Sequence, residues 1–145
     1  MKKLLICASL ALAMAAQAQN PPLKTVQLSV GKHVIVAEVA ATQEQRELGL
    51  MYRDSLAVNG GMLFAFGAQG AQCMWMRNTA LPLSVAFLDA AGSVINIEDM
   101  QPHTLDSHCP TRAVRARYAL EMNLGWFRLR NIKPGMAIAN LPAEK

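Results

Sequence analysis

Residues 25–39, with the sequence TVQLSVGKHVIVAEV, are the stretch that decides the fold class. Apolar and polar side chains alternate on both sides of Gly31 and Lys32, as they do when one face of a strand is buried and the other meets water. A connection of two residues is the length that hairpins prefer. The stretch therefore predicts a β-hairpin with strands at residues 25–30 and 33–39.

The rest of the chain is again rich in strand signals. Thr42 and Gln45 form a capping box, which predicts a short helix from residue 43 to about residue 51, weakened near its end by Gly49. Many short strands separated by turn signals predict a mainly β protein, a compact single-domain sandwich or small barrel with one or two short helices. The further predicted strands are residues 62–66, 71–76, 84–89, 93–100, 118–122 and 136–139, with a polar loop at 101–111 and a short helical turn at 125–131. The turn signal Asp89-Ala90-Ala91-Gly92 predicts a second hairpin, between residues 84–89 and 93–100.

The first 18 residues have the pattern of a signal peptide. Lys2 and Lys3 precede an apolar run, and Ala16 and Ala18 supply the small residues that signal peptidase accepts. The apolar run is shorter than the roughly 20 residues that a membrane span needs. We therefore expect cleavage after Ala18, export to the periplasm or beyond, and one domain at residues 19–145 that does not span a membrane.

Charge excludes one class of partner. The full chain carries a net charge of +4, and without Lys2 and Lys3 there remain 12 basic and 10 acidic residues, a net charge of +2. Arg112, Arg115 and Arg117 form the densest basic run, which is typical of a solvated edge. Because no basic stripe stands out, we expect no nucleic-acid partner.

The cysteines agree with export. Removal of the signal peptide takes Cys7 away and leaves Cys73 and Cys109. A pair of cysteines in an oxidising compartment usually forms a disulfide, and this one would contribute roughly 3–4 kcal/mol through the loop that it closes. Two free buried thiols are the alternative.

Four ordered blocks resemble a known family. They are residues 46–53 (RELGLMYR), 61–66 (GMLFAF), 75–79 (WMRNT) with Pro82-Leu83, and Leu120-Glu121 ahead of Gly125, and together they resemble the domain of unknown function family numbered 192. The resemblance covers about residues 26–138. It implies a compact all-β sandwich or barrel of jelly-roll type with one short helix, and it implies no activity, because none is established for the family.

The chain departs from the family pattern at two positions. Ser84 stands where the family usually has an aspartate, and Met74 where an aromatic residue is common. The serine leaves no carboxylate at position 84 to act as a base. At Arg77 lysine is also common, which indicates that a positive charge matters more there than a planar fork.

The polar residues of these blocks are candidates for a binding site. Arginine presents a fork of donors that suits carboxylate or phosphate, and an amide or hydroxyl completes such a site. The alternative for the helix arginines is an ordinary surface pair with Glu44, Glu47 or Asp54. The predicted ligand-binding residues are Arg46, Arg53, Trp75, Arg77, Asn78, Thr79 and Glu121.

Glu121 is unusual because it lies in the middle of a predicted strand, between Leu120 and Met122. A buried carboxylate normally needs a partner. We expect Arg77 to be that partner, in a pair that is structural or functional.

The methionines suggest a metal site as an alternative. Met74 and Met76 would share one face of a strand, and thioethers are suitable ligands for copper(I). His103 or His108 would supply a nitrogen, since both lie in the loop that ends at Cys109. Methionine is also a common filler of irregular cores, which is the plainer explanation.

No catalytic motif for a serine hydrolase, a zinc peptidase or a nucleotide-binding enzyme is present. The sequence therefore favours an exported, non-enzymatic binding or accessory module for a small polar or anionic ligand or an envelope protein, without a cofactor. A copper(I)-binding periplasmic protein is the first alternative, and an envelope enzyme of unknown reaction is the second.

Overall fold

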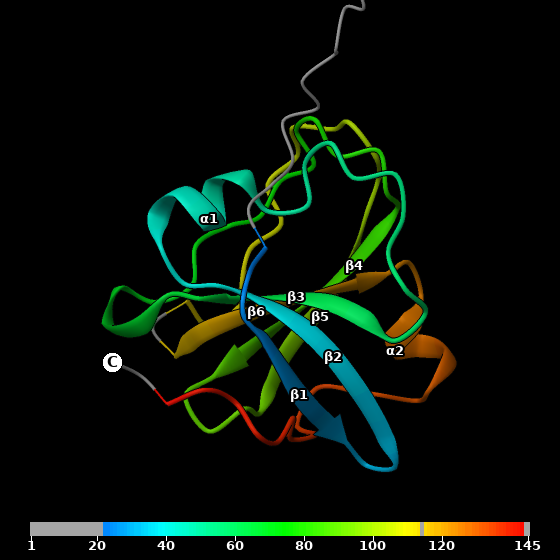
Figure 1. Ribbon diagram of the computed structural model, residues 1–145. Coiled ribbons are helices and arrows are strands. Elements are labelled where there is room, and N and C mark those ends of the chain that lie inside the picture. Colours follow the sequence, from blue (N-terminus) through cyan, green and yellow to red (C-terminus); the bar gives the residue numbers. More distant parts are fainter. Residues whose placement is uncertain (1–21, 114, 144–145) are drawn as a thin grey trace, which may run out of the picture.

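The computed structural model describes residues 22–113 and 115–143. Six strands form one mixed sheet in the order β1-β2-β3-β6-β4-β5 (Figure 1). Only β2 and β3 run parallel, and the other neighbouring pairs are antiparallel. The mainly β, compact single-domain fold is confirmed, and its sheet does not close on itself. The predicted signal peptide lies outside the described residues.

Short helices connect the strands. In chain order the elements are β1 (Thr25–Val30), β2 (His33–Ala40), α1 (Gln43–Leu48), β3 (Gly60–Ala65), the 3-10 turn η1 (Gly67–Gln69), β4 (Leu83–Asp89), β5 (Val94–Met100), β6 (Ala116–Asn123) and α2 (Trp126–Leu129). Within the described part of the chain, no helix is both long and apolar enough to cross a bilayer.

Both predicted hairpins are confirmed. β1 and β2 pair from Val30 and His33 outward, around the two-residue connection. In the β4–β5 connection, Asp89 Oδ1 accepts hydrogen bonds from the backbone N–H groups of Ala91 (3.0 Å) and Ser93 (2.8 Å). A side chain that binds its own turn in this way explains why aspartate marks it.

The capping box of α1 is also confirmed, but the helix ends before residue 51. Thr42 Oγ1 accepts from the Gln45 N–H at 3.2 Å, and Gln45 Oε1 accepts from the Thr42 N–H at 3.0 Å. Gly49 follows with φ +47°, and a Cβ atom there would lie 3.2 Å from the ring of Phe64. The close approach to Phe64 and the left-handed backbone both require glycine, and they turn the chain away from the helix axis.

Two predicted strands are wrong. Residues 71–76 contain only an isolated bridge between Met74 and His108, and residues 136–139 contain only the bridges of Ala137 to Ser93 and of Ala139 to Ser29. Buried and exposed residues alternate in residues 74–76 and 136–139, but neither segment forms a continuous ladder with a strand.

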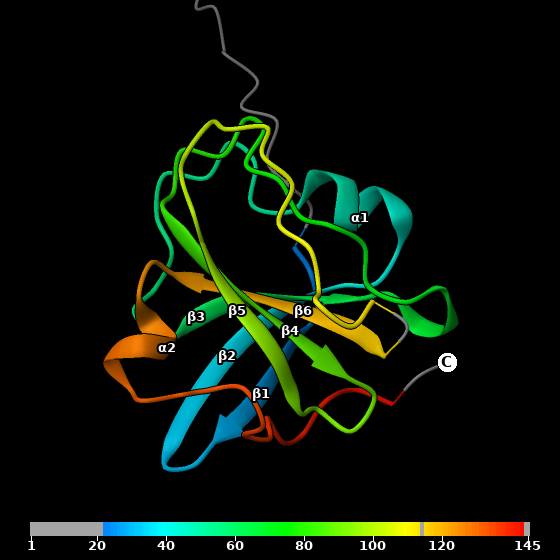
Figure 2. The same ribbon diagram turned by 180° about the vertical axis from the view of Figure 1, so that it is seen from behind.

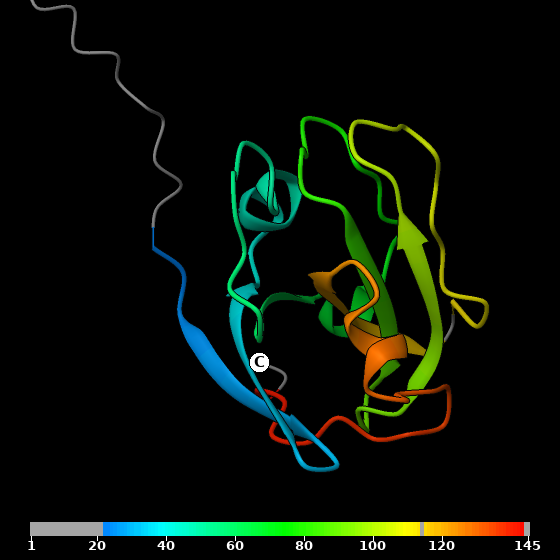
Figure 3. The same cartoon turned by 90° about the vertical axis from the view of Figure 1, so that its right-hand side faces the viewer.

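The sheet has an apolar core on each face. On the first face, here called the α2 face, side chains of the sheet pack against α2 and residues 130–141. These covering segments contribute Trp126, Phe127 and Ile138 to the core. On the other, here called the loop face, the core is completed by residues 50–56 and 66–81, among them Leu50 and Met76. Figures 2 and 3 show the loops after α1, before β4 and after β5 gathered at one end of the molecule, opposite to the β1–β2 turn.

Candidate functional site

The segment from Met74 to Thr79 crosses the loop face with alternating side chains. Met74 and Met76 are buried, whereas Trp75 is 49 % exposed and Arg77 is exposed. The Arg77 guanidinium lies over the Trp75 ring, 5.7 Å from its centroid. This cation–π pair leaves an aromatic surface and a positive charge side by side in water.

Asn78 and Thr79 shape the turn that follows. Asn78 has φ +52°, and its Nδ2 donates to Tyr52 Oη at 2.9 Å while the Tyr52 N–H donates to the Asn78 carbonyl at 3.0 Å. Thr79 is buried, and its hydroxyl donates to the Arg77 carbonyl at 3.0 Å. Both side chains therefore hold loops together.

Arg53 is engaged away from this segment. Its two terminal nitrogens donate to the two carboxylate oxygens of Glu38 at 2.7 and 2.8 Å, a bidentate pair between the loop after α1 and strand β2. The hydrogen bond that Arg53 donates to Glu38 raises the pKa of the guanidinium above its ordinary value. The alternative surface partners for Arg53, which were Glu44, Glu47 and Asp54, are therefore wrong, and Glu38 takes their place.

Glu121 is 3 % exposed and has no hydrogen-bond or ion-pair partner among the described residues. In the sheet it lies between Met62 of β3 and Val85 of β4, on the loop face. Burial raises the pKa of its carboxyl group to about 8. The predicted pair with Arg77 is wrong, because the exposed Arg77 packs on Trp75 instead.

Glu121 is one of three glutamates in a single row across the loop face. The register of the sheet aligns Glu38, Met62, Glu121, Val85 and Glu98 on neighbouring strands. The two outer glutamates have partners, since Glu38 binds Arg53 and Glu98 Oε2 lies 2.8 Å from His108 Nδ1. Glu121, the central glutamate of the row, has no such partner among the described residues, and burial is the cause of its raised pKa.

A cavity of about 450 Å³ opens between α1 and residues 64–75, and it is here called the α1 cavity. Arg46 forms part of its wall, with Nη1 donating to the carbonyls of Ala41 (2.5 Å) and Ala65 (3.0 Å) and the guanidinium 5.4 Å from the centre of the Phe66 ring. The cavity is lined by Gln43, Arg46, Glu47, Phe64, Phe66, Gln69, Gln72, Cys73, Met74 and Trp75. Of the predicted ligand-binding residues it unites two, Arg46 and Trp75.

The predicted disulfide is present. Cys73 and Cys109 are bonded, with an S–S distance of 2.09 Å, and the neighbouring residues Met74 and His108 exchange both backbone hydrogen bonds at 2.7 and 2.9 Å. His103 lies apart from this pair, exposed and with φ +59°. Of the predicted metal ligands the structure therefore pairs Met74 with His108, while Met76 is buried in the same core.

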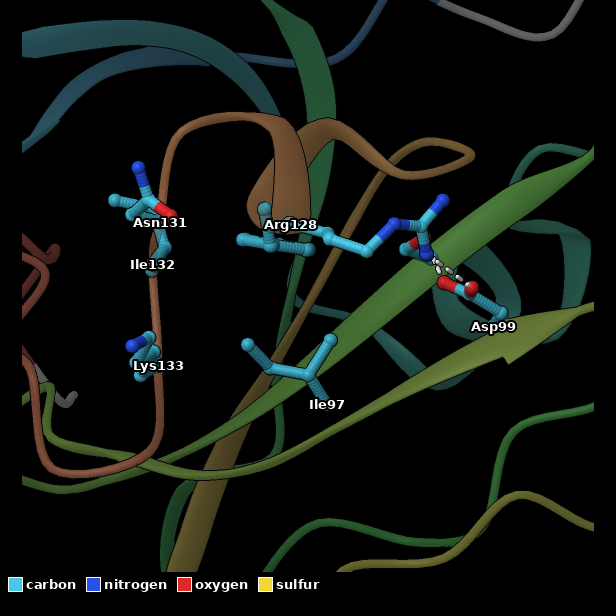
Figure 4. A pocket seen from close by; sticks show the side chains of 8 residues that line it. Ile97, Asp99, Arg128, Asn131, Ile132 and Lys133 are labelled. Carbon is cyan, nitrogen blue, oxygen red and sulfur yellow. Dashed lines mark hydrogen bonds and ion pairs between the residues drawn. The ribbon is translucent and has the colours of Figure 1, made fainter.

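A second cavity, of about 350 Å³, lies on the α2 face beside Ser84 and Asp99 (Figure 4). The Ser84 hydroxyl donates to Asp99 Oδ1 at 2.5 Å and accepts from the Gly125 N–H at 2.8 Å, and Arg128 Nη1 lies 3.0 Å from Asp99 Oδ2. Neither of these two cavities is lined by Arg77, Glu121 or a histidine.

A family model described as "Uncharacterized ACR", DUF192, matches residues 26–140. The chain belongs to the DUF192 family. Among solved structures it is similar to a protein of unknown function from Novosphingobium aromaticivorans, with 31 % identity over 92 % of this chain and 100 % of the other, and a TM-score of 0.74. It is also similar to a protein from Sinorhizobium meliloti described as a candidate transcription regulator, with 34 % identity over 79 % of this chain and 90 % of that one, and a TM-score of 0.68. None of the curated proteins matches the chain.

In this DUF192 protein, sequence reasoning missed the amides of the α1 cavity and the role of Glu38. Gln43 lies on α1, but Gln69 ends the short 3-10 turn η1 and Gln72 lies in irregular chain, where no periodicity indicates which way a side chain points. Glu38 lies in β2 on the same face as Ala40 and faces the loop-face core. Glu38 is a charged residue in a predicted strand whose alternate residues are apolar. This pattern was the signal in the sequence that could have revealed its role.

Proposed function

We propose that this DUF192 protein is a non-enzymatic binding module and that a saccharide unit binds in the α1 cavity. The observation that carries the proposal is the composition of that cavity, whose lining combines a half-exposed tryptophan with three glutamine amides. Its volume of about 450 Å³ falls in the range of small-ligand sites, which is roughly 300–1,000 Å³.

The side chains of the cavity suit an uncharged polar ligand better than an anion. Arg46 Nη1 is already engaged by two backbone carbonyls, and the carboxylate of Glu47 lies in the same wall. An anion would meet that negative charge. The amides of Gln43, Gln69 and Gln72 both donate and accept hydrogen bonds, as sugar hydroxyls require.

Trp75 supplies the apolar half of the site. One face of a pyranose ring carries mainly C–H groups, and an aromatic ring offers a flat apolar surface for it. The Arg77 guanidinium beside Trp75 keeps that ring oriented. Export through the predicted signal peptide would place the site where envelope glycans are available.

The description of the Sinorhizobium relative as a transcription regulator is not extended to this chain. Its arginine run at Arg112, Arg115 and Arg117 is the densest basic segment, and only Arg112 and Arg115 are exposed. Two exposed arginines do not make the basic stripe that nucleic-acid binding needs.

Trp75 also provides a direct test. Glucose, galactose, N-acetylglucosamine and their β-linked disaccharides are titrated while tryptophan fluorescence is recorded, because Trp126, the other tryptophan, is buried and reports little. We expect a saturable change with at least one probe, lost in Trp75→Phe and weakened several-fold in Gln72→Ala.

Gln101→Ala is the matched control, because Gln101 is an exposed glutamine in another loop. The control should titrate like the unchanged protein. No fluorescence change with any of these sugars, or an unaltered titration in Gln72→Ala, would contradict saccharide binding in the α1 cavity.

A further inference from the structure

The loop-face core contains four buried methionines, Met62, Met74, Met76 and Met100. One of them is paired with His108, and another lies on the same strand face as the carboxylate partner of His108. Met74 is the bridge partner of His108, and directly paired residues project their side chains to the same side with Cβ atoms about 5 Å apart. Met100 follows Glu98, the carboxylate partner of His108, by two residues on the same face of β5.

The His108 ring has one nitrogen paired and one unpaired. Nδ1 lies 2.8 Å from Glu98 Oε2, and a carboxylate can only accept, so Nδ1 carries the hydrogen. In the neutral ring Nε2 then holds a lone pair. Nε2 is buried, and it has no hydrogen-bond partner among the residues that the structure describes. A buried polar atom of this kind is costly unless a ligand engages it.

The Glu98–His108 pair is held firmly. Asn96 Nδ2 donates to Glu98 Oε1 (3.3 Å) and to the Cys109 carbonyl (3.1 Å), and Asn96 Oδ1 accepts from the Thr111 N–H (3.1 Å). A carboxylate that accepts from one ring nitrogen is the usual support of a histidine whose other nitrogen binds a metal. It fixes both the tautomer and the ring orientation.

The disulfide joins the two sides of this arrangement. Cys73 and Cys109 are the chain neighbours of Met74 and His108, so the thioether and the imidazole are held together by a covalent link. Because both sulfur atoms of the cysteines are bonded to each other, thiolates are not available as ligands. No three of the described histidines, cysteines, aspartates and glutamates gather to hold an ion, and the sulfur donors that this core offers are its methionine thioethers.

We propose that His108 Nε2 and the Met74 thioether, with the thioether of Met76 or Met100, form a binding site for a soft univalent ion of the copper(I) class. Thioether and imidazole ligands are suited to copper(I), whereas hard ions need oxygen ligands. Met74 is 8 % exposed and the His108 side chain 15 % exposed, which places the site just beneath the surface.

Silver(I) is the probe of choice, because it is soft and univalent and requires no reductant that would open the disulfide. The full chain carrying Cys7→Ser, which removes the remaining cysteine, is titrated with silver(I) in chloride-free buffer. Native mass spectrometry measures how many ions are retained, and calorimetry measures the affinity. We expect one tightly held ion that is lost in Met74→Leu and in His108→Ala, and an affinity about 10–100-fold weaker in Glu98→Gln.

Met122→Leu is the matched control, since Met122 is equally buried but lies on the α2 face. It should retain the ion, and comparing Met76→Leu with Met100→Leu identifies the third ligand. Leucine nearly conserves the volume of methionine, so Met74→Leu tests the site even if His108→Ala unfolds. Retention of no ion by the unchanged chain, or equal retention by Met74→Leu, would overturn the proposal. The sugar titration uses Trp75 and Gln72, which are not ligands here, so the two proposals can fail separately.

Discussion

Glu121 is a carboxylic acid surrounded by apolar side chains near the centre of the sheet. Its strand neighbours are Met62 and Val85, and the nearest carboxylates in its row, Glu38 and Glu98, are occupied by Arg53 and His108. With a pKa of about 8, its carboxyl group is protonated at neutral pH in the folded protein. In the unfolded chain it has the ordinary value of 4.5 and is ionised.

This difference makes stability depend on pH. A raised folded pKa means that the folded state holds the proton more tightly, so stability is highest below pH 4.5 and falls until pH 8, where both states are ionised. The loss is at most roughly 1.4 kcal/mol per pH unit in that window. Glu121→Gln, which cannot ionise, should be about as stable as the unchanged protein at pH 5 and clearly more stable at pH 9, measured by urea unfolding.

The other titrating groups contribute equally to the stability of both proteins, so their contributions cancel when the two stabilities are compared at the same pH. Glu44→Gln, a change at an exposed position of α1, should leave the pH dependence as it is. A constant difference between Glu121→Gln and the unchanged protein from pH 5 to pH 9 would show that Glu121 does not titrate as described.

Single residues of the site were only partly predictable. Arg46 and Trp75 were expected in a binding site and line the α1 cavity, and Cys73 and Cys109 were expected to pair and do. The partner expected for Glu121 was wrong, because strand alternation indicates which face a side chain occupies and not which loop covers it. Arg77, two residues from Trp75 along an alternating segment, points outward with it.

At the scale of the elements, the contact between β3 and β6 depends on a residue without a side chain. Gly61 pairs with Met122, and a Cβ atom at Gly61 would collide with Met122 Sδ and lie 2.7 Å from the Glu121 carbonyl oxygen. The thioether of Met122 thus occupies the space that a side chain at position 61 would take.

Gly61→Ala should therefore destabilise the protein by about 1–3 kcal/mol, the usual cost of overpacking, because the backbone oxygen cannot move without breaking the ladder. Urea unfolding measures the loss. Gly60→Ala serves as the control, since the atoms nearest to its new Cβ belong to Ala57 and none lies closer than 3.1 Å. Equal stability of the two variants would contradict the close packing of β3 on β6.

The strand predictions differ in outcome for a physical reason. The two hairpins were predicted because alternation and turn chemistry occur together in residues 25–39 and around Asp89. Alternation alone reports that one side of an extended segment is buried. Residues 71–76 satisfy it by burying Met74 and Met76 on the loop face, although only Met74 has a bridge partner.

For the whole molecule, export and oxidation go together. The proposed signal peptide would deliver the chain to a compartment where the Cys73–Cys109 bond forms and persists. Expressed with its own N-terminus in a bacterium, the protein should be recovered outside the cytoplasm, beginning at Gln19 and lighter than the reduced form by its two thiol hydrogens. Intact mass measurement with and without reductant tests both points. A product that keeps residues 1–18, or that contains two free thiols, would contradict the proposed route.

The position of β6 has a consequence for how the polypeptide reaches its final state. This strand comes last of the six along the chain, yet it pairs with both β3 and β4 in the middle of the sheet. Until it is inserted, β1–β2–β3 and β4–β5 are two separate ribbons with open edges, and the early part of the chain cannot complete the sheet. The export that we propose would gain from such an order, because a polypeptide is threaded through a translocation pore before it folds, and this sheet cannot be completed until nearly all of the chain has passed.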